Sequence, residues 1–180
     1  MKAVIDTNVL LVANGDHADV SAECRIECVQ HLQGIQALGV VVIDDGFRIL
    51  GEYLKKTKLN PPKGVGDVFL KGLLREANNP ARVEQVTITD LPGQCFAEFP
   101  DAALQPSFDA SDRMFAAVAN AHPMKPPVWQ AADCKWLDWW HRLHAQGVQV
   151  EFLCEQDACR FYARKFPNKP LPERPSKALL

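Results

Sequence analysis

Apolar and polar positions along the chain follow two different periods, one typical of buried strands and one typical of amphipathic helices. The runs at 3–5 and 40–43 are short, continuous and rich in β-branched residues, which predicts strands covered on both faces. Between them, residues 20–38 carry apolar side chains at helical spacing. The pattern then predicts a helix over 47–58, a helix over 67–77, a strand over 82–89, a helix over 114–120, a strand over 126–132, a helix over 137–145, a strand over 148–153 and a helix over 155–165. Strands that alternate with helices predict an α/β fold, a three-layer α/β/α sandwich with a mainly parallel central sheet.

Three stretches interrupt this alternation. Residues 60–66 hold two prolines and two glycines and are predicted to form a loop, and residues 90–108 hold three prolines and little periodicity. The stretch 167–180 contains four prolines, which predicts an extended or disordered tail. We therefore expect a main domain over 1–153 and a C-terminal helix with a Pro-rich tail over 154–180.

Composition narrows the class of protein. With 180 residues, 47% hydrophobic and 23% charged, the chain is long enough for one ordinary globular domain. No apolar run approaches the roughly 18 residues that a membrane span needs, and the first strand begins after a single lysine, without room for a signal peptide. We expect a cytoplasmic protein without a membrane segment.

The six cysteines should then be mostly reduced thiols. Cys24 and Cys28 lie one helical turn apart, and Cys154 and Cys159 flank a strand-to-helix junction. Neither pair has the spacing of a common zinc site, so we expect buried core thiols, with a structural zinc ion as the alternative.

Charge is distributed unevenly along the chain, although the net charge is only −2. Residues 1–54 carry three basic and eight acidic side chains, residues 55–80 six basic and two acidic, and residues 155–180 six basic and three acidic. An acidic centre with basic flanks suits a metal-dependent enzyme that acts on a polyanion, whereas each segment alone is also explained as solvated surface charge.

Acidic residues recur at equivalent places in the predicted fold. Asp6 and Asp133 each follow a predicted parallel strand, Asp112 opens a helix, and Glu52 lies early in the helix that follows a strand. Strand ends and the helix starts that follow them share one edge of a doubly wound sheet, so these four carboxylates can converge. Converging carboxylates repel one another unless a cation binds, and hard oxygen ligands favour Mg²⁺ or Mn²⁺. For Asp6 and Asn8, hydrogen bonds to the local backbone of a turn are the simpler alternative.

At this point the chain resembles a known family. The start Asp-Thr-Asn at 6–8, Gly-Glu-Tyr at 51–53, Asp-Arg-Met-Phe-Ala-Ala-Val-Ala at 112–119 and Ala-Asp-Cys-Lys-Trp at 132–136 resemble the motifs of PIN domains in type and order. The resemblance covers about residues 1–153. It implies a PIN-like fold and a Mg²⁺- or Mn²⁺-dependent nuclease, mostly on single-stranded RNA. Many bacterial and archaeal members are toxins neutralised by an antitoxin protein, and homodimers are common among them.

The resemblance also implies roles for individual residues. It implies that Asp6, Glu52, Asp112 and Asp133 form the catalytic, metal-binding quartet. Asn8 would help to position a ligand or a water molecule. Asp109 could be an accessory acid, although capping the helix that starts near Ser111 is the more economical role. Asp44 and Asp45 compete with Glu52 for the second acidic place, and we prefer Glu52 because a tyrosine follows it.

The last motif departs from the family pattern. A hydroxyl or an asparagine often precedes the aspartate and a second acid often follows two residues after it, whereas this chain has Ala132 and Lys135 there. This departure motivates an alternative function, a catalytically degenerate PIN-like domain that binds RNA or protein. A haloacid dehalogenase-type phosphatase also begins with an aspartate after the first strand, but this chain has Asn8 where that chemistry needs a second aspartate.

Other chemistry-bearing residues have structural explanations beside functional ones. Lysines at 55, 56, 58 and 63 (Lys55, Lys56, Lys58 and Lys63) are our candidates for contacts with substrate phosphates, followed by Lys71 and Arg75. The tryptophans at 129, 136, 139 and 140 could stack on bases, but their spacing favours core packing with one partly exposed. The histidines at 141 and 144 are expected on a solvated helix face.

Overall fold

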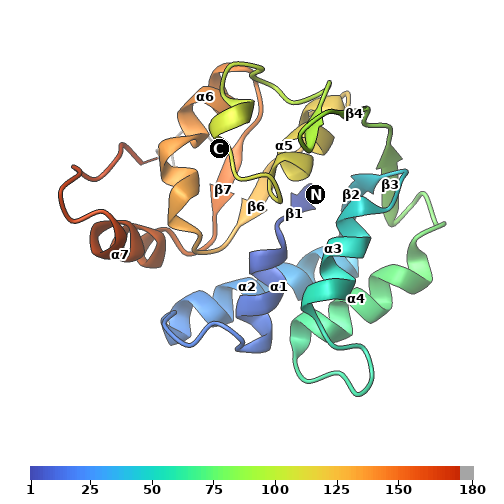
Figure 1. Cartoon of the computed structure of the whole chain (residues 1–180). Helices are drawn as coiled ribbons and strands as arrows, with labels where there is room; N and C mark the ends of the chain where they lie inside the picture. Colours follow the sequence, from blue (N-terminus) through green and yellow to red (C-terminus); the bar gives the residue numbers. More distant parts are fainter. Residues whose placement is uncertain (175–180) are drawn as a thin grey trace.

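The computed structural model describes residues 1–174 and contains a parallel sheet between layers of helices (Figure 1). Within these residues five strands lie in the order β3-β2-β1-β6-β7, and every neighbouring pair is parallel. The elements are β1 (Lys2–Ile5), α1 (Thr7–Asn14), α2 (Ala22–Leu38), β2 (Val40–Asp44), α3 (Arg48–Lys56), α4 (Val65–Glu76), β3 (Val83–Val86), β4 (Asp90–Leu91), β5 (Cys95–Phe96), η1 (Gln105–Ser107), α5 (Arg113–Ala121), β6 (Val128–Gln130), η2 (Cys134–Asp138), α6 (Trp140–Ala145), β7 (Val150–Phe152) and α7 (Glu155–Lys165). The predicted three-layer α/β/α sandwich with a mainly parallel sheet is confirmed.

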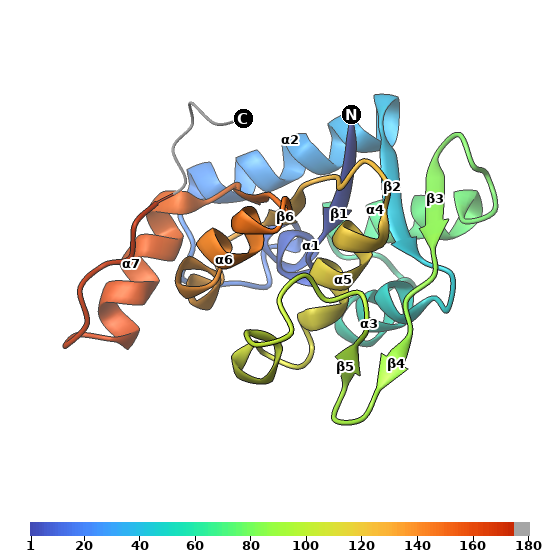
Figure 2. The same ribbon diagram turned by 90° about the horizontal axis from the view of Figure 1, so that it is seen from above.

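Helices cover both faces of the sheet. Helices α2 and α4 lie on one side of the strands, and α5 and α6 lie on the other (Figures 1 and 2). Helices α1, α2 and α4 pack on one another, while α5 packs on β1 and β2. The central strand β1 is accordingly apolar throughout its buried part, with Ala3, Val4 and Ile5 fully buried.

One glycine explains how closely two of these helices approach. A Cβ atom at Gly66, near the start of α4, would lie 2.3 Å from the carbonyl oxygen of Leu10 in α1. No side chain fits there, so glycine lets the backbones of α1 and α4 pack directly. This contact fixes the position of α1 against α4.

The sequence pattern missed some elements and misjudged others. Residues 7–14 form helix α1, which was not predicted, because its short apolar run continues that of β1 without a change of period. The predicted irregular loop over 90–108 contains the two-stranded antiparallel hairpin β4–β5 and the 3₁₀ turn η1. The predicted helix over 137–145 is divided between η2 and α6.

The expectation of mostly reduced cysteines is wrong for one pair. Cys24 in α2 and Cys154, just before α7, form a disulfide across 130 positions of sequence, and Cys28, Cys95, Cys134 and Cys159 are free. The sequence pattern had grouped Cys24 with Cys28, one turn apart, and could not show that α7 begins beside α2.

The C-terminal part of the chain agrees with its prediction as far as the structure describes it. Helix α7 ends at Lys165, and residues 166–174 form no helix or strand, as the prolines predict. The rest of the predicted tail, 175–180, lies outside the described residues, and the division at residue 153 stays a prediction.

Of the helices in the described part, none is both long and apolar enough to cross a membrane.

Candidate metal centre

The carboxyl ends of β1 and β6 lie side by side and hold the first part of the site. Ile5 is paired with Trp129 in the sheet, and the Asp6 amide donates to the Trp129 carbonyl oxygen at 2.9 Å. The side-chain oxygen of Asn8 accepts a hydrogen bond of 2.9 Å from the Ala132 amide. Asn8 therefore fastens the start of α1 to the loop that carries Asp133, a positioning role within the protein.

Three aspartates meet beside this edge. Carboxylate oxygens of Asp109, Asp112 and Asp133 all lie within 4.8 Å of one another, and we refer to these three residues as the carboxylate cluster. Asp109 and Asp112 come from the loop that leads into α5, and Asp133 precedes η2. Two of the four predicted acids are thus brought together with the residue predicted to be accessory.

A buried arginine, which the sequence analysis did not single out, holds the loop with Asp109 and Asp112. The Arg113 guanidinium donates to the carbonyl oxygens of Phe108 at 3.0 Å and Gly93 at 2.9 Å. These bonds tie the entrance of α5 to the β4–β5 hairpin. The only sequence signal is the charge next to Asp112, and a surface arginine would look the same.

Asp6 is buried beside the carboxylate cluster. It is 4% exposed, and its carboxylate accepts a hydrogen bond of 2.8 Å from the Asn8 amide. Burial raises the pKa of Asp6 well above its ordinary value, and repulsion from Asp112, Asp133 and Glu52 adds to the rise, against the effect of the Asn8 amide. The hydrogen bond to the local backbone, expected as the simpler role of Asp6, is present, and the other acids also lie near Asp6.

The pKa of Asp112 is also raised. Burial raises the pKa of Asp112 to about 6, with further contributions from the charges of Asp133 and Asp109. Hydrogen bonds from Ser111, at 3.0 Å, and from the Trp136 indole nitrogen, at 3.3 Å, act in the opposite direction. Trp136 is fully buried in the core, so it fixes the position of this carboxylate rather than stacking on a base.

Lys135 supplies a cation at the edge of the cluster. Its ammonium group forms an ion pair with the Asp109 carboxylate, and Asp109, Asp133 and Asp112 all favour its charged form. The helix-capping role expected for Asp109 is wrong, because this carboxylate bonds Lys135 and α5 begins without a side-chain cap. The departure at position 135 therefore has a structural consequence, since it places a positive charge where a further acid was expected.

Glu52 lies on α3 near these groups, as its effect on the pKa of Asp6 shows. Its carboxylate is 4.0 Å from the Lys55 ammonium group. The competitor Asp44 is fully buried and accepts hydrogen bonds from the Arg48 and Ile49 amides, both 2.9 Å, and from the Arg48 guanidinium at 3.0 Å. Asp44 is thus fully occupied in holding the start of α3, which supports the preference for Glu52.

The donor set suits a hard divalent cation. The carboxylate cluster consists of oxygen ligands, with Asp6 and Glu52 close by, and contains neither histidine nor cysteine. The buried hydroxyl of Thr7, next to Asp6, has no hydrogen-bond partner among the described residues. The residues therefore fit Mg²⁺ or Mn²⁺ better than zinc.

The remaining candidates lie where their patterns predicted. Lys55, Lys56, Lys58 and Lys63 are all exposed, on the last turn of α3 and the loop after it. The tryptophans pack in the core, with Trp139 partly exposed, and the histidines at 141 and 144 are on the solvated face of α6. Comparison of the chain with protein-family models, curated proteins and solved structures found no match in any of the three.

Proposed function

We propose that this protein is a Mg²⁺- or Mn²⁺-dependent phosphodiesterase that cleaves single-stranded RNA. The observation that carries the proposal is the carboxylate cluster, with Asp109, Asp112 and Asp133 within 4.8 Å and Asp6 buried beside them. Mutual repulsion among carboxylates in a partly buried site is costly, and a bound divalent cation relieves it. The resemblance of the motifs to PIN domains supports RNA as the substrate.

The side chains divide the work of such a reaction. Asp112 and Asp133, with Asp6, would hold the ion, which supplies an activated water molecule and stabilises charge on the phosphate. Asn8 and Trp136 keep Asp6, Asp112 and the Asp133 loop in place through the bonds described above. Glu52, whose charge contributes to the raised pKa of Asp6, would accept a proton from a bound water molecule.

An exposed basic segment offers a path for the RNA backbone. Lys55 lies one turn after Glu52, with its ammonium group 4.0 Å from that carboxylate, so the basic segment begins at the edge of the site. Lys56, Lys58 and Lys63 continue it along the chain. Lysines bind phosphates without reading bases, which suits a strand held by its backbone. In the toxin-type version of this function, the protein acts in the cytoplasm, and an antitoxin or a second copy of the chain is its protein partner.

The proposal is tested by incubating labelled single-stranded RNA with Mn²⁺, Mg²⁺ or EDTA. Asp6→Asn and Asp112→Asn should each lower the cleavage rate by more than about 100-fold, because ligand loss removes the ion. Asp16→Asn, at an exposed position outside the site, is the matched control and should cleave like the wild type. Metal-independent cleavage, or full activity of both site variants, would contradict the proposal.

A second candidate function rests on the Lys135–Asp109 ion pair. A lysine that already neutralises one member of the carboxylate cluster weakens the need for a metal ion. The protein would then be a degenerate module that binds RNA or another protein without turnover. Retention of labelled RNA in EDTA, without cleavage in Mn²⁺ by the folded wild type, would favour this candidate.

A further inference from the structure

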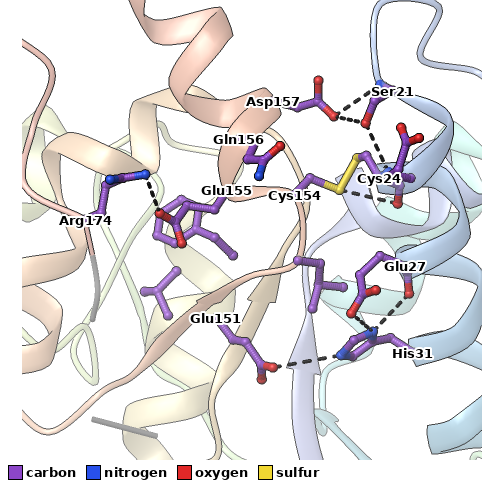
Figure 3. A pocket seen from close by; sticks show the side chains of 14 residues that line it. Ser21, Cys24, Glu27, His31, Glu151, Cys154, Glu155, Gln156, Asp157 and Arg174 are labelled. Atoms are coloured by element: carbon purple, nitrogen blue, oxygen red, sulfur yellow. Dashed lines mark hydrogen bonds and ion pairs between the residues drawn. A yellow bond between two sulfur atoms is a disulfide. The ribbon is translucent and has the colours of Figure 1, made fainter. Parts of the chain in front are cut away.

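A cleft of about 1050 Å³ opens between α2 and the segment from β7 to the start of α7. Figure 3 shows the Cys24–Cys154 disulfide on its wall, with His31 and Glu151 facing each other across the lower part. The His31 ring is held by the Glu27 carbonyl oxygen at 2.9 Å and lies 3.9 Å from the Glu151 carboxylate. None of these residues belongs to the carboxylate cluster or to the function proposed above.

A third cysteine lies against this disulfide. Cys28 is one helical turn after Cys24 on α2, and its sulfur is 3.7 Å from that of Cys154. The three sulfur atoms all lie within 4.8 Å of one another, and we refer to Cys24, Cys28 and Cys154 as the thiol cluster. All three side chains are at most 5% exposed. A disulfide uses two sulfurs and leaves the third unexplained.

The spacing of the sulfurs corresponds to a metal–thiolate site. Zn–S bonds of about 2.3 Å in a tetrahedral site place neighbouring sulfurs about 3.8 Å apart. The distance from Cys28 to Cys154 already has this value, so only Cys24 and Cys154 have to separate when their bond is opened. The backbones of α2 and of the start of α7 are near enough, since the Cα atoms of Cys24 and Cys154 are 5.0 Å apart.

The charge of the cleft favours a cation as well. Its lining residues include five acids, listed here: Glu23, Glu27, Glu151, Glu155 and Asp157. Among the described lining residues, Arg174 is the one arginine or lysine, and it is paired with Glu155 at 3.3 Å. A cleft lined mainly by acidic side chains raises the local concentration of cations.

We propose that the thiol cluster, once its disulfide is reduced, binds a zinc ion, with a water molecule from the cleft as the fourth ligand. A dithiol reductant supplies two electrons and two protons to the Cys24–Cys154 bond and is itself oxidised to a disulfide. The three thiols then each lose a proton to the buffer as zinc–sulfur bonds form. Zinc would replace the covalent link between α2 and α7, which suits a compartment that keeps thiols reduced.

The test uses cobalt as a coloured substitute for zinc. Wild-type protein is reduced without oxygen, freed of reductant and titrated with Co²⁺, and sulfur-to-cobalt charge-transfer absorption is recorded. Carboxylate ligands give no such absorption, so the carboxylate cluster does not interfere. We expect one equivalent of thiolate-bound cobalt, displaced by Zn²⁺, and no such absorption from protein that keeps its disulfide.

Two cysteine variants make the test specific. Cys28→Ala leaves Cys24 and Cys154 able to form their disulfide, so it can fold, and it should weaken metal binding by more than about tenfold. Cys159→Ala removes a free cysteine outside the thiol cluster and should bind like the wild type. Equal binding by Cys28→Ala and the wild type would overturn the proposal. Circular dichroism shows whether the reduced wild type is folded. Absence of thiolate-bound cobalt in the reduced wild type would overturn the proposal whether or not that protein is folded.

Discussion

Two buried aspartates in different regions of this protein have pKa values shifted in opposite directions. Asp67, at the start of α4, is 1% exposed, and Asp6, at the end of β1, is 4% exposed. Burial raises the pKa of both carboxyls, yet the net effect lowers the pKa of Asp67 and raises that of Asp6 well above its ordinary value. Burial is the largest cause of the rise for Asp6, and solvent exposure alone does not separate the two acids, so the groups around each carboxylate have to be compared.

The neighbours of Asp67 are hydrogen-bond donors. Its carboxylate accepts bonds from the Lys63 amide at 2.8 Å, the Lys58 amide at 3.1 Å and the Asn14 side chain at 2.7 Å. These donors stabilise the ionised form and tie α1, α4 and the loop between α3 and α4 together. Asp67 is a structural acid that needs no metal ion.

The neighbours of Asp6 and Asp112 are other carboxylates. Asp6 accepts a bond from the Asn8 amide but lies near Asp112, Asp133 and Glu52, and Asp112 lies within 4.8 Å of Asp109 and Asp133. Such an arrangement costs folding free energy, and function is the usual reason why a protein keeps it. The contrast separates a candidate site from ordinary buried acids without any reference to relatives.

The largest effect expected from this contrast is on stability. Asp67→Asn should lower the free energy of unfolding by about 3 kcal/mol, because the amide group places a donor against backbone donors and loses the charge they stabilise. Urea denaturation measures the loss, since a two-state transition gives the free energy directly. The folded fraction of this variant should retain metal binding.

The matched variant is Asp112→Asn in the other region. It removes repulsion within the carboxylate cluster, so its stability in EDTA should equal or exceed that of the wild type. If Asp112→Asn lost as much stability as Asp67→Asn, the division into structural and functional acids would be wrong.

A somewhat smaller effect is expected on the pH dependence of stability. The folded-state pKa of Asp112 is about 6 against 3.8 for the free group, so between these values the folded state holds a proton that the unfolded state has lost. Stability in EDTA should therefore fall by about 2 kcal/mol as pH rises from about 4 to about 6. Acids with a lowered pKa, such as Asp67, lose their contribution only at lower pH.

This pH effect is measured as the difference between the wild type and Asp112→Asn in denaturation curves from pH 4 to pH 7.5. Saturating Mn²⁺ should abolish the difference above pH 6, because the ion takes the place of the proton. A difference that does not change over this range would contradict the electrostatic account of the site.

The smallest effect is expected at Lys135. Replacing it with alanine removes the partner of Asp109 and adds a net negative charge to the carboxylate cluster. Affinity for Mn²⁺ should rise by up to about fivefold, which corresponds to a partly exposed ion pair. Calorimetric titration measures the change, with Lys169→Ala on the exposed stretch after α7 as the control. Weaker binding by the Lys135 variant would mean that the lysine supports the site rather than competing with the metal ion.

The sequence alone determined the architecture, because hydrophobic periodicity reports which faces are buried. The continuous apolar runs of β1 and β2 and the helical spacing in α2 and α7 were enough to predict a parallel sheet between layers of helices. The same logic placed Asp6 and Asp133 at the same edge of the sheet, and the structure shows that their strands are neighbours. Helix α1 was not predicted because its apolar residues follow those of β1 directly, without a change in hydrophobic period.

Only the tertiary structure decided which side chains meet. Local pattern does not report contacts between distant segments, so the grouping of Asp109 with Asp112 and Asp133, and the link from Cys24 to Cys154, came from packing. The roles of Arg113 and Trp136 were equally hidden, since a buried donor and a surface residue look alike in sequence. Which buried acid repels its neighbours and which is satisfied depends on donors supplied from elsewhere in the chain, and the fold alone brings those donors within hydrogen-bond distance.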